Sequence, residues 1–240
     1  MKKGILLRGK HKVERIVGRF LGYDFFLKKK YKSSLELTFV GDQIGGWVLP
    51  VALINQKSIC YCGGCGDNIS FDLSLIKLKQ CSIFGFDPTP NVAELLTPLI
   101  INNPNYTLLQ IGLWDKKEVV KFYEPQNMTH TAFSALNLQN TNNYVELNCD
   151  SVSNIASQLG HSKIDLLKID IEGAEYKVID SIIKDGPQPS IFCVEFDEYF
   201  SPIDAEARSR IIHYVDKIIS SNYSLVHSER NGNYTFVKNF

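Results

Sequence analysis

Residues 59–71, ICYCGGCGDNISF, run from an apolar segment through a glycine-rich loop into a segment whose apolar residues have helical spacing. The apolar start predicts a buried strand. Gly63, Gly64 and Gly66 follow it, and glycines at such a turn let the backbone take positive φ and approach a ligand closely. This succession of strand, glycine turn and helix predicts the first unit of an α/β fold, with a ligand site at the turn.

The same alternation continues through the rest of the chain. Short apolar runs that predict strands occupy residues 58–62, 82–86, 106–113, 164–169 and 190–196. Segments long enough for amphipathic helices lie at 68–79, 90–101, 150–160, 173–184 and 204–220, and Asp67 or Asn68 can cap the first of them. Residues 223–227 and 233–238 predict a terminal hairpin with Asn231-Gly232 at its turn. We therefore predict a mostly parallel sheet that ends in an antiparallel pair.

Composition limits the class of protein. The chain has 240 residues, 44% of them hydrophobic, with 26 basic and 26 acidic side chains. This length favours one domain with at most a small appendage, and the zero net charge argues against a nucleic-acid partner. Six cysteines are too few for a small disulfide scaffold. Apolar runs are too short for a membrane span or a secretory signal, so we expect a cytoplasmic protein with reduced thiols.

The basic charge is concentrated near the N-terminus. Residues 1–32 contain eleven Lys and Arg but only Glu14 and Asp24 as acids. We divide the chain into a basic N-terminal extension, 1–44, and a main domain, 45–240. The interpretation we favour is a helical extension that packs its apolar side on the domain, because charge runs are usually solvated faces. A surface that meets anionic membrane, nucleotide-sugar or nucleic acid is the alternative.

The glycine loop and the end of the next strand together suggest a nucleoside cofactor. Asp87 lies 21 positions after Gly66, a spacing that suits a carboxylate accepting hydrogen bonds from ribose hydroxyls. The loop lacks the third glycine of the dinucleotide fingerprint, and Asp67 at its exit suits a cofactor that carries an ammonium group. S-adenosylmethionine is therefore favoured over NAD. The cysteines of the loop have no second C-x-x-C pair, which argues against structural zinc.

A second motif, IDLLKIDIEGAEY at 164–176, places acidic residues where a buried strand ends. In open α/β sheets, ligands bind outside the carboxyl ends of the strands. Asp170 directly follows the strand, so we predict that it belongs to the site. Glu172 is the next candidate. Glu175 lies at the start of the following helix, where a carboxylate stabilises the helix dipole, and we interpret it as structural.

The segments GGWVLP (45–50), CGGCGDNISFD (62–72), FGFDPTP (84–90), IGLWD (111–115) and DLLKIDIEGAEY (165–176) resemble the FkbM family of S-adenosylmethionine-dependent methyltransferases. The resemblance covers about residues 45–198. It implies an α/β class I methyltransferase fold, Rossmann-like, with seven strands in the order 3-2-1-4-5-7-6 and the last strand antiparallel. The cofactor-binding residues that it implies are Gly63, Gly64, Gly66, Asp67, Asp87 and Asp170, and we add Pro88, Leu113 and Trp114 from the matching segments.

Methyl transfer from a sulfonium is an in-line displacement, so the protein aligns the acceptor and removes a proton from it. The candidates for that proton are Asp170, Glu172, Glu195 and His130. His130 belongs to 124–143, a polar stretch that predicts a loop or lid. A divalent ion shared by Asp170 and Glu195 is an alternative, but no ligand spacing favours it and we predict no metal.

Resemblance favours O-methylation of a hydroxyl on a sugar, a glycan or a small molecule. An NAD-dependent nucleotide-sugar oxidoreductase is one alternative; it needs a third loop glycine and a Tyr-x-x-x-Lys pair, and neither occurs in the expected place. A non-catalytic nucleotide-binding module of the same fold is the other, and the acids Asp87 and Asp170 argue against it. The sequence does not indicate the oligomeric state.

Overall fold

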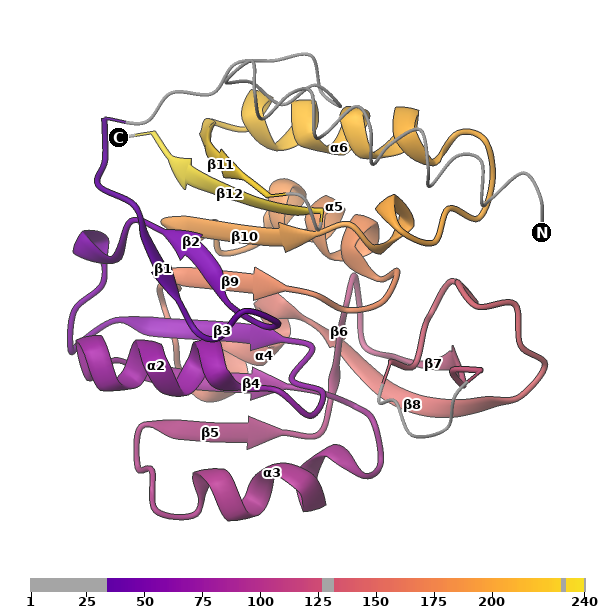
Figure 1. The fold of residues 1–240 in the computed structure, drawn as a ribbon, viewed down its shortest axis with the longest axis horizontal. Helices are drawn as coiled ribbons and strands as arrows, with labels where there is room; N and C mark the ends of the chain where they lie inside the picture. The colour runs from indigo at the N-terminus through magenta and orange to yellow at the C-terminus, as the bar shows by residue number, and fades with distance from the viewer. Residues whose placement is uncertain (1–33, 127–131, 230–231, 240) are drawn as a thin grey trace.

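A seven-stranded sheet forms the centre of the computed structural model, which describes residues 34–126, 132–229 and 232–239 (Figure 1). Across the sheet the strands follow the order β5-β4-β3-β9-β10-β12-β11, and β12 alone runs antiparallel to its neighbours. Counted along the chain, that order is 3-2-1-4-5-7-6. The strands are β3 (Ile59–Gly63), β4 (Ser82–Phe86), β5 (Tyr106–Leu109), β9 (Leu166–Ile169), β10 (Ile191–Glu195), β11 (Tyr223–Ser228) and β12 (Asn233–Lys238).

Helices cover both faces of this sheet (Figure 1). They are α2 (Ser70–Lys79), α3 (Val92–Ile100), α4 (Val152–Leu159), α5 (Glu175–Asp185) and α6 (Ala207–Ser220). Successive side chains of a strand point to opposite faces. Leu167 of β9 accordingly packs in the cluster of α4, α5 and α6, and Leu166 packs in the cluster of α2 and α3. The predicted α/β class is confirmed, because the near-continuous apolar strands are buried on both sides.

A two-stranded hairpin lies on the α2 face of the sheet. Its strands are β1 (Thr38–Val40) and β2 (Trp47–Leu49), and a short 3₁₀ helix, η1 (Val51–Leu53), follows. Trp47 is buried, and the hydroxyl of Thr235 in β12 donates to the carbonyl of Val48 at 2.8 Å. The predicted boundary between 44 and 45 falls in the turn of this hairpin. Residues 1–33 of the predicted extension lie outside the described ranges.

A second, three-stranded sheet interrupts the expected pattern. It contains β6 (Gly112–Trp114), β7 (Glu118–Tyr123) and β8 (Tyr144–Ser151), in the order β6-β8-β7. The apolar run 106–113, predicted as one strand, breaks where the amide of Ile111 donates to the carbonyl of Leu109. The chain therefore leaves the main sheet, and β6 pairs with β8 instead. Within 124–143, residues 127–131 lie outside the described ranges, and His130 with them.

Local capping explains where two helices begin. The side-chain oxygen of Asn68 accepts the amide of Ser70 at 2.9 Å, so Asn68 rather than Asp67 satisfies the start of α2. The hydroxyl of Ser151 accepts the amide of Asn154 at the start of α4. No helix in the described part of the chain is long and apolar enough to cross a membrane.

A buried carboxylate ties the C-terminal helices together. Glu198 lies in the 3₁₀ helix η2 (Asp197–Tyr199), which follows β10, and it is 1% exposed. It accepts from the Tyr176 hydroxyl of α5 at 2.7 Å and from two nitrogens of Arg210 in α6, each at 2.6 Å. Charge-assisted bonds of this bidentate form are strong and directional. Glu198 therefore fixes the positions of α5 and α6 relative to the end of β10.

Replacing Glu198 should test this role. Glu198→Ala leaves Arg210 and Tyr176 without their shared acceptor, so we expect the free energy of unfolding to fall by about 3 kcal/mol, the lower end for a broken buried pair because Arg210 is partly exposed. The exposed neighbour Glu206 serves as the control, and Glu206→Ala should change stability by less than about 0.5 kcal/mol. Denaturant unfolding of both variants measures the difference; equal stabilities would show that the network contributes nothing.

Candidate functional site

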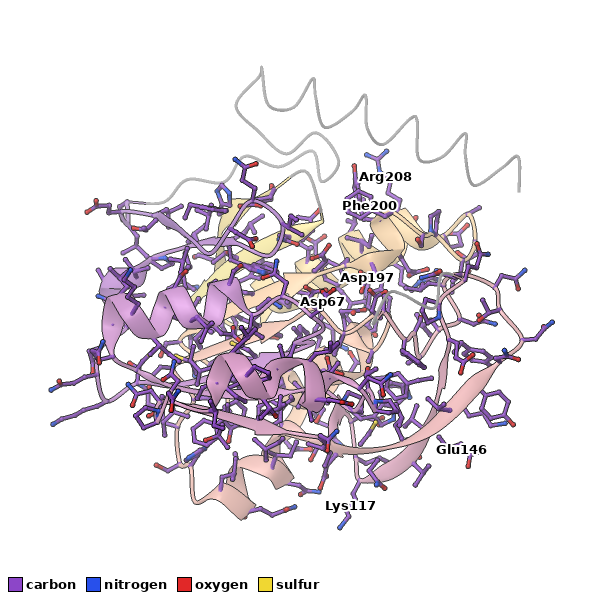
Figure 2. All side chains as sticks on the ribbon, turned by 60° about the horizontal axis from the view of Figure 1, so that its bottom comes forward. Asp67, Lys117, Glu146, Asp197, Phe200 and Arg208 are labelled. Carbon is purple, nitrogen blue, oxygen red and sulfur yellow. The ribbon has the colours of Figure 1, made fainter. Side chains whose placement is uncertain are left out.

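One cavity of ≈ 350 Å³ opens at the carboxyl ends of the parallel strands. Its wall combines the loop after β3, the ends of β4, β9 and β10, and parts of the hairpin β1–β2 and of the second sheet. Two of its acids, Asp67 after β3 and Asp197 after β10, are labelled in Figure 2. The predicted residues that line the cavity are Gly64, Gly66, Asp67, Asp87, Pro88, Leu113, Asp170, Glu172 and Glu195.

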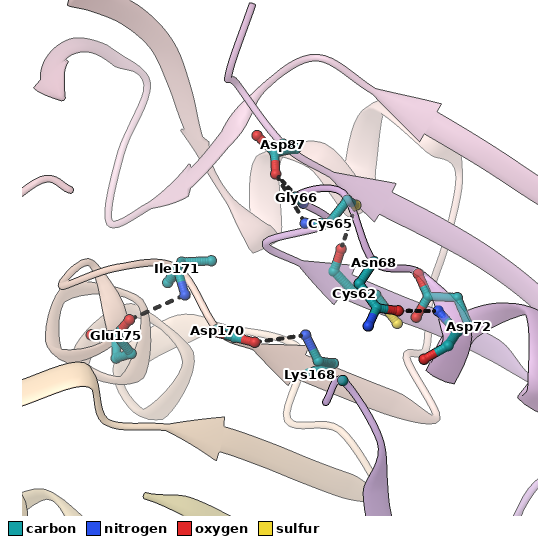
Figure 3. A network of polar contacts seen from close by, with 12 residues as sticks. Cys62, Cys65, Gly66, Asn68, Asp72, Asp87, Lys168, Asp170, Ile171 and Glu175 are labelled. Atoms are coloured by element: carbon teal, nitrogen blue, oxygen red, sulfur yellow. Dashed lines mark hydrogen bonds and ion pairs between the residues drawn. The ribbon is translucent and has the colours of Figure 1, made fainter. Parts of the chain in front are cut away.

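Asp87 holds the glycine loop at the end of β4. Its Oδ2 accepts the amides of Cys65 at 3.0 Å and of Gly66 at 2.9 Å (Figure 3). Its Oδ1 accepts the amide of Thr89 at 2.9 Å. Asp87 is 5% exposed, so these bonds compensate the cost of burying its charge. A carboxylate has about four acceptor positions, which leaves room for one more donor.

The glycine loop touches the strand-end acid on its other side. Gly64 has φ +78, and a Cβ atom on it would lie 1.6 Å from the carbonyl oxygen of Asp170. The amide of Asp170 in turn donates to the carbonyl of Gly63 at 3.2 Å. This contact requires glycine for two reasons, the left-handed backbone and the absence of space. It brings the loop after β3 and the loop after β9 together at the floor of the cavity.

A buried lysine lies beneath this contact. Lys168 in β9 is 6% exposed, and its Nζ is 3.3 Å from Oδ2 of Asp170 (Figure 3). Burial alone lowers the pKa of Lys168, but the carboxylates of Asp170 and Asp72 outweigh it and keep the amine charged. Asp72, on α2, is itself buried and accepts from the hydroxyl of Tyr106 at 3.1 Å. Sequence analysis missed Lys168, although an isolated lysine inside an apolar strand is an available signal.

Four carboxyl groups gather at the end of the cavity formed by β9 and β10. They belong to Asp170, Glu172, Glu195 and Asp197. Burial, together with the charges of Asp197 and Asp170, raises the pKa of Glu172 to about 9. Burial and the charge of Asp170 raise the pKa of Asp197 to about 7. Burial, with the charges of Asp170 and Asp197, also raises the pKa of Glu195. Like charges that lie close together in a buried position disfavour one another.

Glu175 stabilises the turn between β9 and α5 by accepting hydrogen bonds from its amides. It is 1% exposed, and its Oε1 accepts the amide of Ile171 at 3.2 Å (Figure 3). The same oxygen accepts the amide of Gly173 at 3.0 Å. Glu172 has φ +53 and Gly173 has φ +101, so the turn contains two consecutive left-handed residues. Such a turn needs local hydrogen bonds, which Glu175 supplies.

The connection between β7 and β8 contacts the same turn. Ala132 and Phe133 line the cavity. The hydroxyl of Ser134 and the amide of Ala135 both donate to the carbonyl of Glu172, at 2.7 and 3.1 Å. The described part of the predicted loop 124–143 is therefore anchored directly beside the acidic end of the cavity.

Two predicted residues do not line the cavity. Gly63 lies within β3 and is covered by Leu113 and Ile171. Trp114 packs in a separate cluster of the second sheet, and its indole nitrogen donates to Glu118 at 2.6 Å. His130 lies in residues 127–131, outside the described ranges. All six cysteines are free and buried.

Several known proteins resemble this chain. The human probable methyltransferase-like protein 24 is 28% identical over 130 residues, which are 54% of this chain and 29% of that protein. This chain thus spans less than a third of the length of that relative. Among solved structures, the methyltransferase FkbM from Methylobacillus flagellatus KT has 12% identity and a TM-score of 0.49, covering 77% of this chain and 44% of that one.

A second solved structure is fibrillarin from Aeropyrum pernix, described in complex with natively bound S-adenosyl-L-methionine. It has 10% identity and a TM-score of 0.40, covering 88% of this chain and 85% of that one.

The family model of the methyltransferase FkbM domain matches residues 40–220. The matched range contains β3 with its glycine loop, Asp87 and the acidic end of the cavity. It also includes the second sheet, whose residues lie beside that end. Because the match spans most of the chain, the resemblance expected from the sequence is confirmed, and this chain belongs to the methyltransferase FkbM domain family.

Proposed function

We propose that this chain transfers the methyl group of S-adenosylmethionine to a hydroxyl of a sugar, a glycan or a small molecule. The observation that carries the proposal is that the cavity has two chemically different ends. One end consists of the glycine loop held by Asp87, and the other is a group of carboxylates with Lys168 beside them. A donor and an acceptor bound at opposite ends would meet near Asp170.

The charge of the cavity supports the choice of cofactor. Asp67 and Asp87 line the loop end, Asp170 lies where this end meets the carboxylates, and Lys168 is the one cationic side chain among the described lining residues. A sulfonium and an ammonium are attracted to such a lining, whereas the two phosphates of a dinucleotide are repelled. The remaining acceptor position of Asp87 suits a ribose hydroxyl.

The carboxylate end supports the choice of acceptor. A neutral hydroxyl donates hydrogen bonds to carboxylates, and an anionic acceptor would be repelled by the same groups. In the transfer step, the acceptor oxygen forms a bond to the methyl carbon as the bond from sulfur breaks, and the hydroxyl proton goes to a carboxylate. We assign Asp170 as the acceptor of that proton. Glu195, Glu172 and His130 are the other candidates.

Binding of the cofactor product tests the first half of the proposal. Calorimetry should detect S-adenosylhomocysteine and no NAD at the same concentrations. Asp87→Ala removes the acceptor of two loop amides and of the ribose, so binding should weaken by about 1–3 kcal/mol. Asp185→Ala, at an exposed position, should bind normally. Tight NAD binding by the unaltered chain would favour the oxidoreductase alternative.

A matched pair of glycine variants tests the contact between Gly64 and Asp170. Gly64 and Gly160 both have positive φ, but a Cβ on Gly160 meets nothing within 4 Å. Gly64→Ala should abolish detectable binding of S-adenosylhomocysteine, because the loop must move away from Asp170. Gly160→Ala should keep binding and lose about 1 kcal/mol of stability from strain alone. If both variants bind alike, the close approach does not shape the site.

The carboxylates give a test of the chemical step. Asp170→Asn keeps the shape but removes the proton acceptor, so transfer of labelled methyl to an acceptor found by screening sugars and alcohols should fall about 10²–10⁴-fold. Glu175→Gln retains an oxygen for the amides of Ile171 and Gly173, so turnover should stay within a few-fold. An inactive Glu175→Gln beside a fully active Asp170→Asn would reverse the two roles.

A further inference from the structure

A single positive charge lies in the wall of an otherwise acidic cavity. Seven carboxyl groups line the cavity in the described part of the chain, and Lys168 is the only lysine, arginine or histidine among those lining residues. It is 6% exposed, although lysine is almost never buried unless its charge is paired. Its charge opposes the attraction of the carboxylates for a cationic ligand.

The fold encloses the side chain of Lys168. Its register neighbours are Cys62 of β3 and Cys193 of β10, which are small and buried and leave room for a long side chain between them. Trp47 of the hairpin β1–β2 is buried on the same side. Its ring centroid lies 5.6 Å from Nζ of Lys168, within the range of a cation–π contact. These contacts fix the position of the charge.

Two carboxylates keep this side chain charged. Oδ2 of Asp170 lies 3.3 Å from Nζ of Lys168 (Figure 3). Burial lowers the pKa of Lys168, but the charges of Asp170 and Asp72 raise it by more. Asp72 is itself buried on α2, where it also accepts from the hydroxyl of Tyr106. Lys168 is therefore a fixed positive charge beside Asp170, where the two ends of the cavity meet.

We propose that Lys168 determines how strongly the cavity distinguishes S-adenosylmethionine from its product, S-adenosylhomocysteine. This inference rests on the proposed function, in which donor and acceptor meet near Asp170. The two cofactor forms share the adenine, the ribose and the amino-acid portion. They differ at the sulfur, which is a positive sulfonium in the donor and a neutral thioether in the product. A cation beside Asp170 repels the first form and leaves the second nearly unaffected.

The same charge favours the transfer step. The acceptor oxygen forms a bond to the methyl carbon as the bond from sulfur breaks, the hydroxyl proton goes to a carboxylate, and sulfur loses its positive charge. Repulsion by Lys168 is therefore strongest before the transfer and declines towards the transition state. An interaction that changes in this direction accelerates the chemical step. The more numerous carboxylates still provide the net attraction that binds the donor.

A purely structural role for Lys168 leads to a different expectation. In that case the ammonium only compensates the buried charges of Asp72 and Asp170. Its loss would then lower stability, or weaken both cofactor forms by the same factor. The ratio of the two dissociation constants would stay the same. This ratio therefore separates an effect of charge on the cofactor from an effect on the fold.

Calorimetry with each cofactor form, without an acceptor, measures the ratio. Lys168→Met keeps the length of the side chain and removes its charge. We expect S-adenosylmethionine to bind more tightly relative to S-adenosylhomocysteine by about fivefold or more. Sinefungin, an analogue with a protonated amine in place of the methyl-bearing sulfonium, should gain by a similar factor. An unchanged ratio in the folded variant would overturn the proposal.

Two further variants separate charge from hydrogen bonding and from general effects of substitution. Lys168→Gln keeps an N–H group for Asp170 but carries no charge, so it should shift the ratio as Lys168→Met does. A ratio equal to that of the unaltered chain would assign the role to the hydrogen bond instead. Lys177→Met is the matched control, because Lys177 also pairs with an aspartate, Asp115, at 3.5 Å but does not line the cavity. Its ratio should not change, and a shift as large as that of Lys168→Met would contradict the proposal.

Asp72→Asn tests the same charge from its other side and does not require the lysine variants to fold. Asparagine keeps an acceptor for Tyr106, but the loss of negative charge leaves Lys168 less compensated. S-adenosylmethionine should therefore weaken relative to S-adenosylhomocysteine, and no shift or the opposite shift would contradict the proposal.

The unaltered chain distinguishes the two possible failures. If it binds neither cofactor form, the proposed function is wrong and this inference with it. If it binds both forms and the ratio does not respond to Lys168, only the inference about Lys168 is wrong.

Discussion

The architecture of the cavity depends on the close approach of Gly64 to the carbonyl oxygen of Asp170. This contact exists because β3 lies between β4 and β9, so the loop leaving β3 meets the ends of both neighbours. Asp87 holds the loop from the β4 side through two amides, while Asp170 limits it from the β9 side. A side chain at position 64 would separate the two halves, and the glycine-loop end and the carboxylate end of the cavity would no longer adjoin.

The buried carboxylates at this edge differ in the hydrogen bonds that they receive from the fold. Glu175 and Glu198 are as buried as any residue of the cavity, yet their acceptor positions are filled by amides, a tyrosine and an arginine of the fold. At the same edge, Asp197 has hydrogen bonds with the backbone of Glu172 and the side chain of Glu175, and burial raises the pKa of both Glu195 and Asp197. Each buried charge at this edge must be compensated, and the fold supplies a different set of donors to each carboxylate.

Local patterns in the sequence predicted much of the fold. Strand periodicity, the glycine loop and the acid after each strand depend on neighbours within a few residues, and the mixed α/β sheet followed from them. The second sheet was missed, although Val120 and Phe122 of β7 and Val145 and Leu147 of β8 alternate in the way that half-buried strands require. The polar stretch between those strands instead predicted a loop or lid.

The sequence by itself determined which residues leave the ends of strands, and so named Gly64, Asp87, Asp170, Glu172 and Glu195 at the cavity. The tertiary structure alone decided what lies beside them. Lys168 and Asp197 belong to different elements, and they reach the same cavity through the order of the sheet and the register between its strands. The physical reason is that a strand pattern specifies which face a side chain occupies, whereas its cross-strand neighbour is set by pairing between segments far apart in the chain.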